Sequence, residues 1–326
     1  MSDFTVAIQC GSIGERCGIY TYSQRLEEYL NKNNVNAYMF ESKIRRGWKK
    51  PDLVSIQYEP GMCPPQRLSQ LLQMYKKYPC IVTVHHTGII PRFYDKVDGI
   101  IFHDETQIFK DPTHGDPWDH VVIPHPALVY PEKDQKKLRK KYGIPIDKKV
   151  IGTSGFIAGT GKHIPEVVSE LASKLNDDEF LYLITSFWKG GDFGFKEVTE
   201  KRLEKLGKLD QVKMDTEFVP AKVLNEKMQC CDFMFSWNDS VDRGSNSGAA
   251  MDMLGAHRRI IVKNVPHYNT PMQISGVLKG RLPFNEFVDD ALNAFRTEDL
   301  SMKIDIEQYS WDNKIKDMIK YFEEFI

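Results

Sequence analysis

The sequence contains no apolar run of the roughly 18 residues that a membrane-spanning helix needs. Its start, MSDFTVAIQC, lacks the charged and apolar segments of a secretion signal. Its six cysteines show no C-x-x-C spacing, and its nine histidines show no ligand spacing such as H-E-x-x-H. Asp239 and Asp242 form D-x-x-D rather than the metal-binding D-x-D. We therefore expect a soluble, cytoplasmic protein with reduced, buried thiols and no metal site.

The chain is long, and its composition is typical of globular proteins. The 326 residues are 41% hydrophobic and 27% charged, which is enough for a sizeable core. This length favours two domains of about 150 residues each. The net charge of −1 hides an asymmetry, because residues 1–150 carry 22 Lys and Arg against 17 Asp and Glu, whereas the rest carry 22 against 28. The two halves are expected to meet different partners.

Short β-rich runs alternate with segments of helical period along the first half of the chain. Strands are expected at 4–10, 36–40, 53–58, 80–84, 98–103 and 121–124. Glycines separate the first strand from a helix with apolar residues at i, i+3 and i+4, and a further helix is expected near 66–77. Such alternation predicts βαβ units and a parallel sheet.

The alternation starts afresh after a charged helical stretch at 131–142. Strands are expected at 149–154, 180–186, 213–218, 231–236 and 259–263, and helices near 163–174, 196–207, 220–229 and 246–256. The last segment places Trp311, Ile315, Met318 and Phe322 on one helical stripe. We predict an α/β protein with two doubly wound Rossmann-like domains, 1–145 and 146–308, that face a cleft, followed by a terminal helix at 309–326.

The loop after the first strand carries three glycines, Gly11, Gly14 and Gly18. Their spacing, G-x-x-G-x-x-x-G, is not the dinucleotide-binding fingerprint. The glycines would let backbone amides near a helix N-terminus approach an anion. A tight turn without a ligand remains the alternative.

The loop 155–163 ends in a Gly-Lys pair, but it is not a P-loop, because Phe156 and His163 stand where that motif needs glycine and a hydroxyl. Lys162 remains a candidate phosphate contact at the start of a helix, with a solvated surface lysine as the alternative.

The loop 238–248 offers more groups that suit an anion. Hydroxyls, small residues and free amides converge at the start of a helix, where an anion gains from the helix dipole. The residues expected to take part are Arg243, Ser245, Asn246, Ser247 and Gly248. Arg243 adds a forked cation suited to phosphate, whereas a plain helix cap would need only one Ser or Asn.

The order of these segments resembles the GT-B nucleotide-sugar glycosyltransferases over nearly the whole chain. More narrowly, it is similar to glycosyltransferase family four, the retaining group 1 enzymes. The segments that carry the resemblance are CGIYTYS, IVTVHHTG, VIGTSGFIAGTGKH, CDFMFS with SNSGAAMDMLGAHRRIIV, and YSWDNKIKDMIKYFEEF. The resemblance implies that the terminal helix returns to an acceptor-side first domain and that the second domain binds the nucleotide sugar.

Carried over to this sequence, the family's glycine loop beside the donor diphosphate falls on Gly11 and Gly14, and its lysine falls on Lys162. Phe156 replaces an arginine of the family, and Arg243 would supply the missing cation. The family's histidine at the donor sugar falls on His85, with His86 beside it.

The family's two glutamates, seven residues apart, fall on Gly244 and Asp252. Asp252 would bind the ribose, whereas the carboxylate that contacts the sugar is absent. The family mechanism implies that Lys162, Arg243 and helix amides stabilise the departing diphosphate, and that a phosphate oxygen helps to deprotonate the acceptor. No cofactor besides the donor substrate, no metal and no stable protein partner are expected. A GT-B-like epimerase and a non-catalytic nucleic-acid or scaffold binding protein remain the alternatives.

The segment 43–50 (KIRRGWKK) holds five cations and a tryptophan. Arg45, Arg46, Trp48 and Lys49 would bind a polyanionic acceptor. A glycan or a lipid-linked glycan at a membrane surface ranks ahead of modified DNA, because the overall charge is near zero. A solvated basic loop is the other interpretation.

Overall fold

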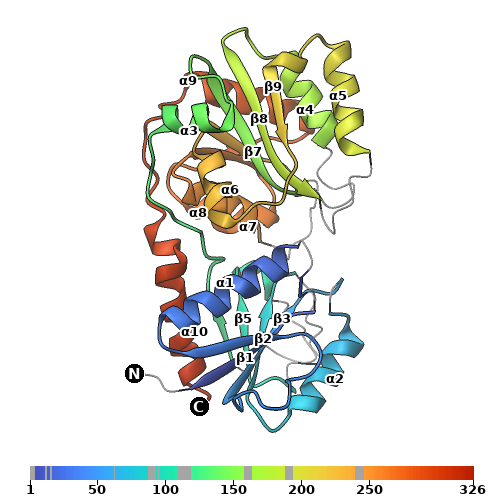
Figure 1. Ribbon diagram of the computed structural model, residues 1–326, viewed down its shortest axis with the longest axis vertical. Coiled ribbons are helices and arrows are strands. Elements are labelled where there is room, and N and C mark those ends of the chain that lie inside the picture. The colour runs from blue at the N-terminus through green and yellow to red at the C-terminus, as the bar shows by residue number, and fades with distance from the viewer. Residues whose placement is uncertain are drawn as a thin grey trace. The chain divides into compact units, whose positions relative to one another are not determined.

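The computed structural model describes residues 4–11, 13–14, 17–61, 63–86, 93, 96–108, 119–157, 164–187, 194–238 and 246–326. The chain divides into two compact units (Figure 1). Unit 1 comprises Met1–Pro126, Asp242–Asn246 and Trp311–Ile326, and unit 2 comprises Ala127–Val241 and Ser247–Ser310. No helix among the described residues is long and apolar enough to cross a membrane.

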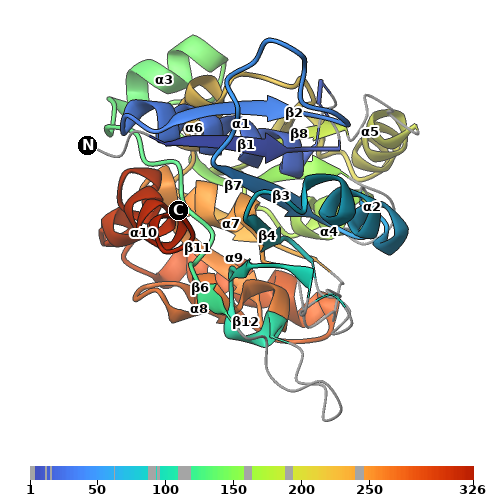
Figure 2. The same cartoon turned by 90° about the horizontal axis from the view of Figure 1, so that it is seen from below.

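Unit 1 is built on a parallel sheet of six strands in the order β2-β1-β3-β4-β5-β6. Its elements are β1 (Thr5–Gln9), α1 (Gly18–Lys32), β2 (Asn36–Phe40), β3 (Leu53–Tyr58), α2 (Pro65–Tyr75), β4 (Cys80–Val84), β5 (Gly99–Phe102), β6 (His120–Val122) and α10 (Trp311–Glu323). The central strands β1, β3, β4 and β5 are buried along their whole length, as parallel strands covered on both faces must be. Figure 2 shows α2 and α10 on opposite sides of this sheet.

The helix α10 belongs to unit 1 although it lies far along the sequence. The Trp311 ring lies 5.1 Å from the ring of Tyr22 and 5.5 Å from that of Tyr29, both on α1. The hydroxyl of Tyr321 accepts a hydrogen bond from the Ile100 amide at 3.1 Å. Gly99 allows this close approach, because a Cβ there would lie 2.6 Å from the same hydroxyl. A helix from the end of the chain therefore completes the core of unit 1.

Unit 2 also contains a parallel sheet of six strands, in the order β12-β11-β10-β7-β8-β9. Its elements are α3 (Gln135–Tyr142), β7 (Lys149–Ile157), α4 (Ile164–Ser173), β8 (Glu179–Phe187), α5 (Phe195–Lys205), β9 (Val212–Asp215), α6 (Ala221–Met228), β10 (Phe233–Ser236), α7 (Gly248–Gly255), β11 (Arg259–Lys263), α8 (Asn269–Gln273), β12 (Leu278–Gly280) and α9 (Phe284–Thr297). One face packs against α4, α5 and α9, and the other against α6 and α7. The predicted architecture of two doubly wound, Rossmann-like α/β domains is confirmed.

The division between the units differs from the expected one at 145 and 146. The charged helix α3 packs within unit 2, where the guanidinium of Arg139 pairs with Asp232 at 2.7 Å. Residues 127–134 also belong to unit 2, where the Lys133 amide donates to the Gln229 side chain at 2.9 Å. The sequence expectations omitted α8, β12 and α9, of which α9 is the longest.

Candidate functional site

The sheet of unit 2 reverses its strand order between β7 and β10. From β7 the chain continues outward to β8 and β9, and it then returns to place β10, β11 and β12 on the other side. The helix α4 follows β7, and the helix α7 follows β10. They cover opposite faces of the sheet, since their buried side chains belong to two different apolar clusters. Ligands of doubly wound sheets bind outside the carboxyl ends of the strands at such a reversal.

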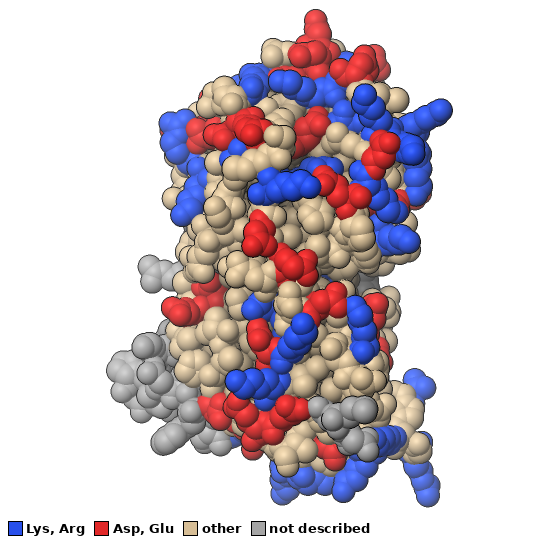
Figure 3. Space-filling view, turned by 90° about the vertical axis from the view of Figure 1, so that its left-hand side faces the viewer, with Lys and Arg blue, Asp and Glu red and all other residues tan. Residues whose placement is uncertain are grey.

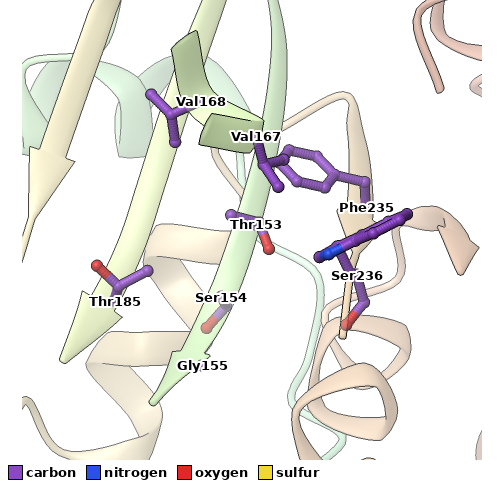
Figure 4. A pocket seen from close by; sticks show the side chains of 9 residues that line it. Thr153, Ser154, Gly155, Val167, Val168, Thr185, Phe235 and Ser236 are labelled. Atoms are coloured by element: carbon purple, nitrogen blue, oxygen red, sulfur yellow. The ribbon is translucent and has the colours of Figure 1, made fainter. Parts of the chain in front are cut away.

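A small pocket lies at this carboxyl edge (Figure 4). It is lined by Thr153, Ser154, Gly155, Val167, Val168, Thr185, Phe235, Ser236 and Trp237. Thr185 and Trp237 are 3% and 6% exposed, and neither Thr185 Oγ1 nor Trp237 Nε1 has a hydrogen-bond partner in the described part of the chain. Buried polar atoms are nearly always satisfied, so polar atoms without partners in the lining of a pocket are available to a polar ligand.

The Trp237 ring is fixed by its neighbours in unit 2. It contacts the rings of Phe284 and Phe287, with centroids 5.4 and 4.9 Å away. The ammonium group of Lys263 lies 4.1 Å from its centroid, in cation–π geometry. Lys263 is only 4% exposed and ends β11, beside β10 in the sheet. The pocket therefore presents a rigid indole N–H, with a buried cation beside it.

The helix α7 starts at the same edge of the sheet. Ser247 is its N-cap, and its hydroxyl accepts a hydrogen bond from the Ala250 amide at 3.2 Å. Gly248 is the first helical residue, and Asp252 is half-buried in the second turn. The structure thus brings Ser247, Gly248 and Asp252 together on one short helix, whose N-terminal dipole favours an anion.

Other predicted donor-binding residues are placed elsewhere. Lys162, Arg243 and Ser245 lie outside the described residues. Asn246 groups with unit 1, where its side-chain amide donates to the carbonyl oxygen of His103 at 3.3 Å.

The glycine loop of unit 1 leaves the carboxyl end of β1, where the strand order of that sheet also reverses. Gly11 lies two residues after the end of β1, and Gly14 has φ +83°, which L side chains rarely adopt. Cys17 caps α1, because its sulfur accepts a hydrogen bond from the Tyr20 amide at 3.4 Å. A Cβ on Gly14 would meet no described atom within 4 Å, so its backbone conformation requires the glycine rather than a close contact.

Three imidazoles form a row across the carboxyl ends of β4, β5 and β6. The ring centroid of His103 lies 5.2 Å from that of His85 and 5.1 Å from that of His125. Tyr22 of α1 touches all three, at 4.5 Å from His85 and at 5.3 and 5.4 Å from the others. We call His85, His103 and His125 the histidine row. No group of three His, Cys, Asp or Glu side chains among the described residues could hold a metal ion.

One ring nitrogen of each imidazole has a fixed acceptor. His85 Nε2 lies 2.9 Å from Gln57 Oε1, His103 Nδ1 lies 2.9 Å from the Ile123 carbonyl oxygen, and His125 Nδ1 lies 3.0 Å from that of Pro126. Burial lowers the pKa of His103 to about 3 and that of His125 to about 4. Burial, helped by repulsion from His103 and His125, holds the pKa of His85 well below its ordinary value. The row is therefore uncharged at neutral pH.

The basic segment lies on the connection between β2 and β3. We call Lys43, Arg45, Arg46, Lys49 and Lys50, all of them exposed, the basic rim. Because β2 and β3 are parallel, this connection runs from the carboxyl end of the sheet to its amino end. The Tyr38 hydroxyl in β2 donates to the Lys49 carbonyl oxygen at 2.9 Å. The rim thus follows the flank of the edge strand, and Figure 3 shows Lys and Arg gathered at the lower end of unit 1.

The tryptophan of this segment is already in contact with its own neighbours. The ring of Tyr38 meets the Trp48 ring edge-on, with centroids 4.8 Å apart, and the Arg45 guanidinium lies 5.4 Å from the Trp48 centroid. The rim continues onto the end of α2, where Lys50 and Lys77 both approach the Tyr78 ring. Because the Trp48 ring already packs on Tyr38 and Arg45, positive charge is the main property by which this surface could bind a partner.

Solved structures match this chain in fold over nearly its whole length. The Anabaena protein HepE, solved with UDP and glucose, superposes with a TM-score of 0.71 at 10% identity, covering 98% of this chain and 100% of HepE. The chain has the GT-B fold. A glycosyltransferase from Rickettsia africae matches with a TM-score of 0.70 at 13% identity over 100% of this chain and 99% of its own. Sucrose-phosphate synthase from Thermosynechococcus elongatus matches with a TM-score of 0.71 at 10% identity over 98% of both chains.

No model of a known protein family matches the sequence, and no curated protein matches it. At these low identities the similarity concerns the GT-B fold itself. The fold that the order of the sequence segments implied is therefore confirmed, while membership of family four remains a prediction.

Four residues of these sites were not predicted from the sequence: Gln57, Thr185, Trp237 and Lys263. Gln57 and Thr185 lie inside the runs LVSIQY and LITSF, where they served only as evidence of strands. A polar residue near the carboxyl end of an otherwise apolar parallel strand is the signal that could have identified them, because that edge is where such sheets bind ligands.

Proposed function

We propose that this protein is a retaining glycosyltransferase, which moves a sugar from a nucleoside diphosphate sugar to an acceptor hydroxyl. The observation that carries the proposal is the pocket at the β7–β10 reversal, where Thr185 Oγ1 and Trp237 Nε1 are buried and have no partner among the residues that the structure describes. The GT-B fold supports the same conclusion, since HepE, which shares it, was solved with UDP and glucose.

The donor would bind at the carboxyl edge of the sheet in unit 2. The backbone amides of the first turn of α7, around Ser247 and Gly248, would attract an anion, so we assign the diphosphate to them. Lys162 and Arg243 would add the cations, and Asp252 would accept hydrogen bonds from the ribose hydroxyls. Ser245 and Asn246, which precede Ser247 in the loop 238–248, would also bind the donor.

Residues of unit 1 are also assigned to binding of a nucleotide sugar. Gly11 and Gly14 would place backbone amides beside the diphosphate, and His85 would bind a hydroxyl of the sugar. The uncharged state of the histidine row suits this task, because an imidazolium would repel the positive charge that develops on the sugar as the leaving group departs.

The transfer breaks the bond between the anomeric carbon and the diphosphate oxygen and forms a bond from that carbon to the acceptor oxygen on the same face. The acceptor proton passes to an oxygen of the departing phosphate, so no side chain needs to act as a base. The protein supplies cations and amides that stabilise the leaving group, and we propose that it does so without a metal ion.

For the acceptor, the basic rim favours a polyanion. Because the Trp48 ring already contacts Tyr38 and Arg45, recognition by charge is favoured over stacking on a base. We therefore assign a glycan or a lipid-linked glycan acceptor, bound through Arg45, Arg46, Trp48 and Lys49, ahead of DNA. A lipid-linked acceptor would bring the protein to a membrane surface.

Incubation of the purified protein with UDP- and GDP-sugars tests the proposal. Slow release of the nucleoside diphosphate together with the free sugar supports a transferase, because water then replaces the acceptor. An isomerised nucleotide sugar would instead indicate an epimerase. Unchanged thermal stability with every nucleotide would indicate a binding protein without this site, since a ligand that binds only the folded state raises stability.

A further inference from the structure

A chain of side-chain hydrogen bonds ends on His85. Gln57, 1% exposed on β3, donates from Nε2 to the hydroxyl of Ser55 at 3.0 Å. This bond orients the amide so that its carbonyl oxygen, Oε1, faces His85 Nε2 at 2.9 Å. A carbonyl oxygen can only accept, so His85 Nε2 must carry the hydrogen.

Backbone pairing and ring packing also fix the position of His85. Its backbone amide donates to the Tyr58 carbonyl oxygen at 2.9 Å, which extends the pairing of β3 with β4. The rings of Tyr22 and His103 pack against the imidazole at 4.5 and 5.2 Å. With one hydrogen on Nε2, the neutral ring keeps a lone pair on Nδ1.

We propose that Gln57 is a positioning residue for sugar transfer, which fixes His85 in the Nε2–H tautomer and so presents Nδ1 as an acceptor to a hydroxyl of the donor sugar. This inference rests on the proposed function. A free imidazole exchanges between its two tautomers, and only one of them can accept from the sugar at Nδ1. Gln57 removes the other tautomer before the donor arrives.

Two substitutions separate positioning from simple structural support. Gln57→Met keeps a side chain of similar length but removes the acceptor, so His85 loses its fixed tautomer. We expect kcat to fall about tenfold, the effect of one neutral hydrogen bond, with a smaller change in the KM for the donor. Gln57→Glu still accepts from Nε2, but its negative charge favours the imidazolium. We expect activity close to that of the parent at pH 8 and an acid limb of kcat/KM shifted upward by about one pH unit.

Histidine tautomers can be read directly from ¹⁵N–¹H long-range NMR spectra of the full chain labelled at histidine, without any turnover. The expected result is the Nε2–H pattern for His85 in the parent and a mixture of tautomers in Gln57→Met. Gln9→Met is the matched control, because Gln9 is equally buried on the adjacent strand β1 but bonds to the Glu41 carbonyl oxygen. It should leave the His85 signals unchanged.

An Nδ1–H tautomer in the parent would overturn the inference, as would equal loss of activity at every pH in both Gln57 variants. If the parent releases no nucleoside diphosphate from any sugar nucleotide, the proposed function fails. In that case an Nε2–H tautomer that Gln57→Met removes would still establish the hydrogen bond but overturn its assignment to sugar transfer.

Discussion

Mild acid should destabilise unit 1 through its histidine row. The pKa of His103 is lowered to about 3 by burial, whereas an unfolded histidine titrates near 6.5. Between these values the unfolded chain binds a proton that the folded chain does not. The stability that His103 contributes is therefore complete above pH 6.5 and is lost as the pH falls toward 3.

The size of the effect follows from this interval. Each pH unit inside it costs about 1.4 kcal/mol per histidine, so a change from pH 7 to pH 5 costs about 2 kcal/mol for His103 alone. His125, with its pKa lowered to about 4, acts in the same direction. Two kcal/mol is a substantial part of the 5–15 kcal/mol that stabilises an average protein.

Carboxylates whose pKa is lowered act below this range. In unit 2 the pKa of Glu226 falls to about 2, chiefly through a hydrogen bond from Lys133. The stability it contributes is present above its unfolded value of about 4.5 and is lost only below that pH. Burial raises the pKa of Glu27 on α1, so this carboxylate acts in the opposite direction above pH 4.5. The interval from pH 6.5 to pH 5 therefore reports the buried histidines, offset by the contribution of Glu27.

Urea unfolding at pH 7, 6 and 5, followed by tryptophan fluorescence, measures the effect, because Trp311 is 1% exposed in unit 1. The variant His103→Gln should be less stable at pH 7 but should lose about 1.4 kcal/mol less per pH unit than the parent. His120→Gln removes an exposed histidine from β6 and serves as the control. Equal stability of the parent at pH 7 and pH 5, or the full pH dependence in His103→Gln, would refute this role of the buried histidines.

Four further outcomes are expected. Trp237→Phe keeps an aromatic ring but removes the indole N–H, so calorimetry should show nucleotide affinity weakened about fivefold, together with a lower Tm from the smaller buried ring, and undiminished affinity would contradict a role in the pocket. Lys162→Ala and Arg243→Ala should each weaken nucleotide binding by about 1.5–3 kcal/mol, and parental affinity in both would exclude them from the diphosphate site. Phe322→Ala, at a fully buried position of α10, should lower the free energy of unfolding in urea by about 3–5 kcal/mol. A decrease below about 1 kcal/mol would mean that α10 does not complete the core. Four residues of the basic rim can be replaced by serine together: Arg45, Arg46, Lys49 and Lys50. Sugar transfer to the acceptor should then be slower and less dependent on salt, while hydrolysis of the donor persists. Equal loss of both activities would mean that the rim serves folding or donor binding instead.

Local patterns were sufficient to predict most of the fold. Parallel strands buried on both faces give continuous apolar runs, so the strands at 53–58, 80–84 and 259–263 could be predicted at their observed bounds. The helix α9 has equally clear periodicity in Phe284, Phe287, Val288 and Leu292, but the sequence expectations left it out. The boundary between the units was not predictable locally, because it depends on pairs such as Arg139 with Asp232, 93 residues apart.

The candidate site was less predictable than the fold. Loops rich in glycine, serine and asparagine can be recognised in a sequence, because turns and helix caps need those residue types. His103 and His125 appear in the sequence as isolated histidines, and nothing local indicates that the sheet places them beside His85. Their shared contact with Tyr22 depends on where the start of α1 lies beside the carboxyl ends of β4, β5 and β6, which only the three-dimensional structure reveals.

The position of α10 also has a consequence for synthesis on the ribosome. The strands of unit 1 are complete by residue 122, yet Trp311, Met318 and Phe322, which fill its core, are made only after all of unit 2. The apolar surface that α10 covers, beside α1, must therefore stay exposed while about 180 further residues are added, a delay of about 10–40 s at ordinary elongation rates. Unit 2, whose main segments are contiguous apart from a short excursion at Asp242–Asn246, can finish folding first. During that interval the uncovered α10-binding face of unit 1 is the surface most exposed to aggregation and the natural place for a chaperone to bind.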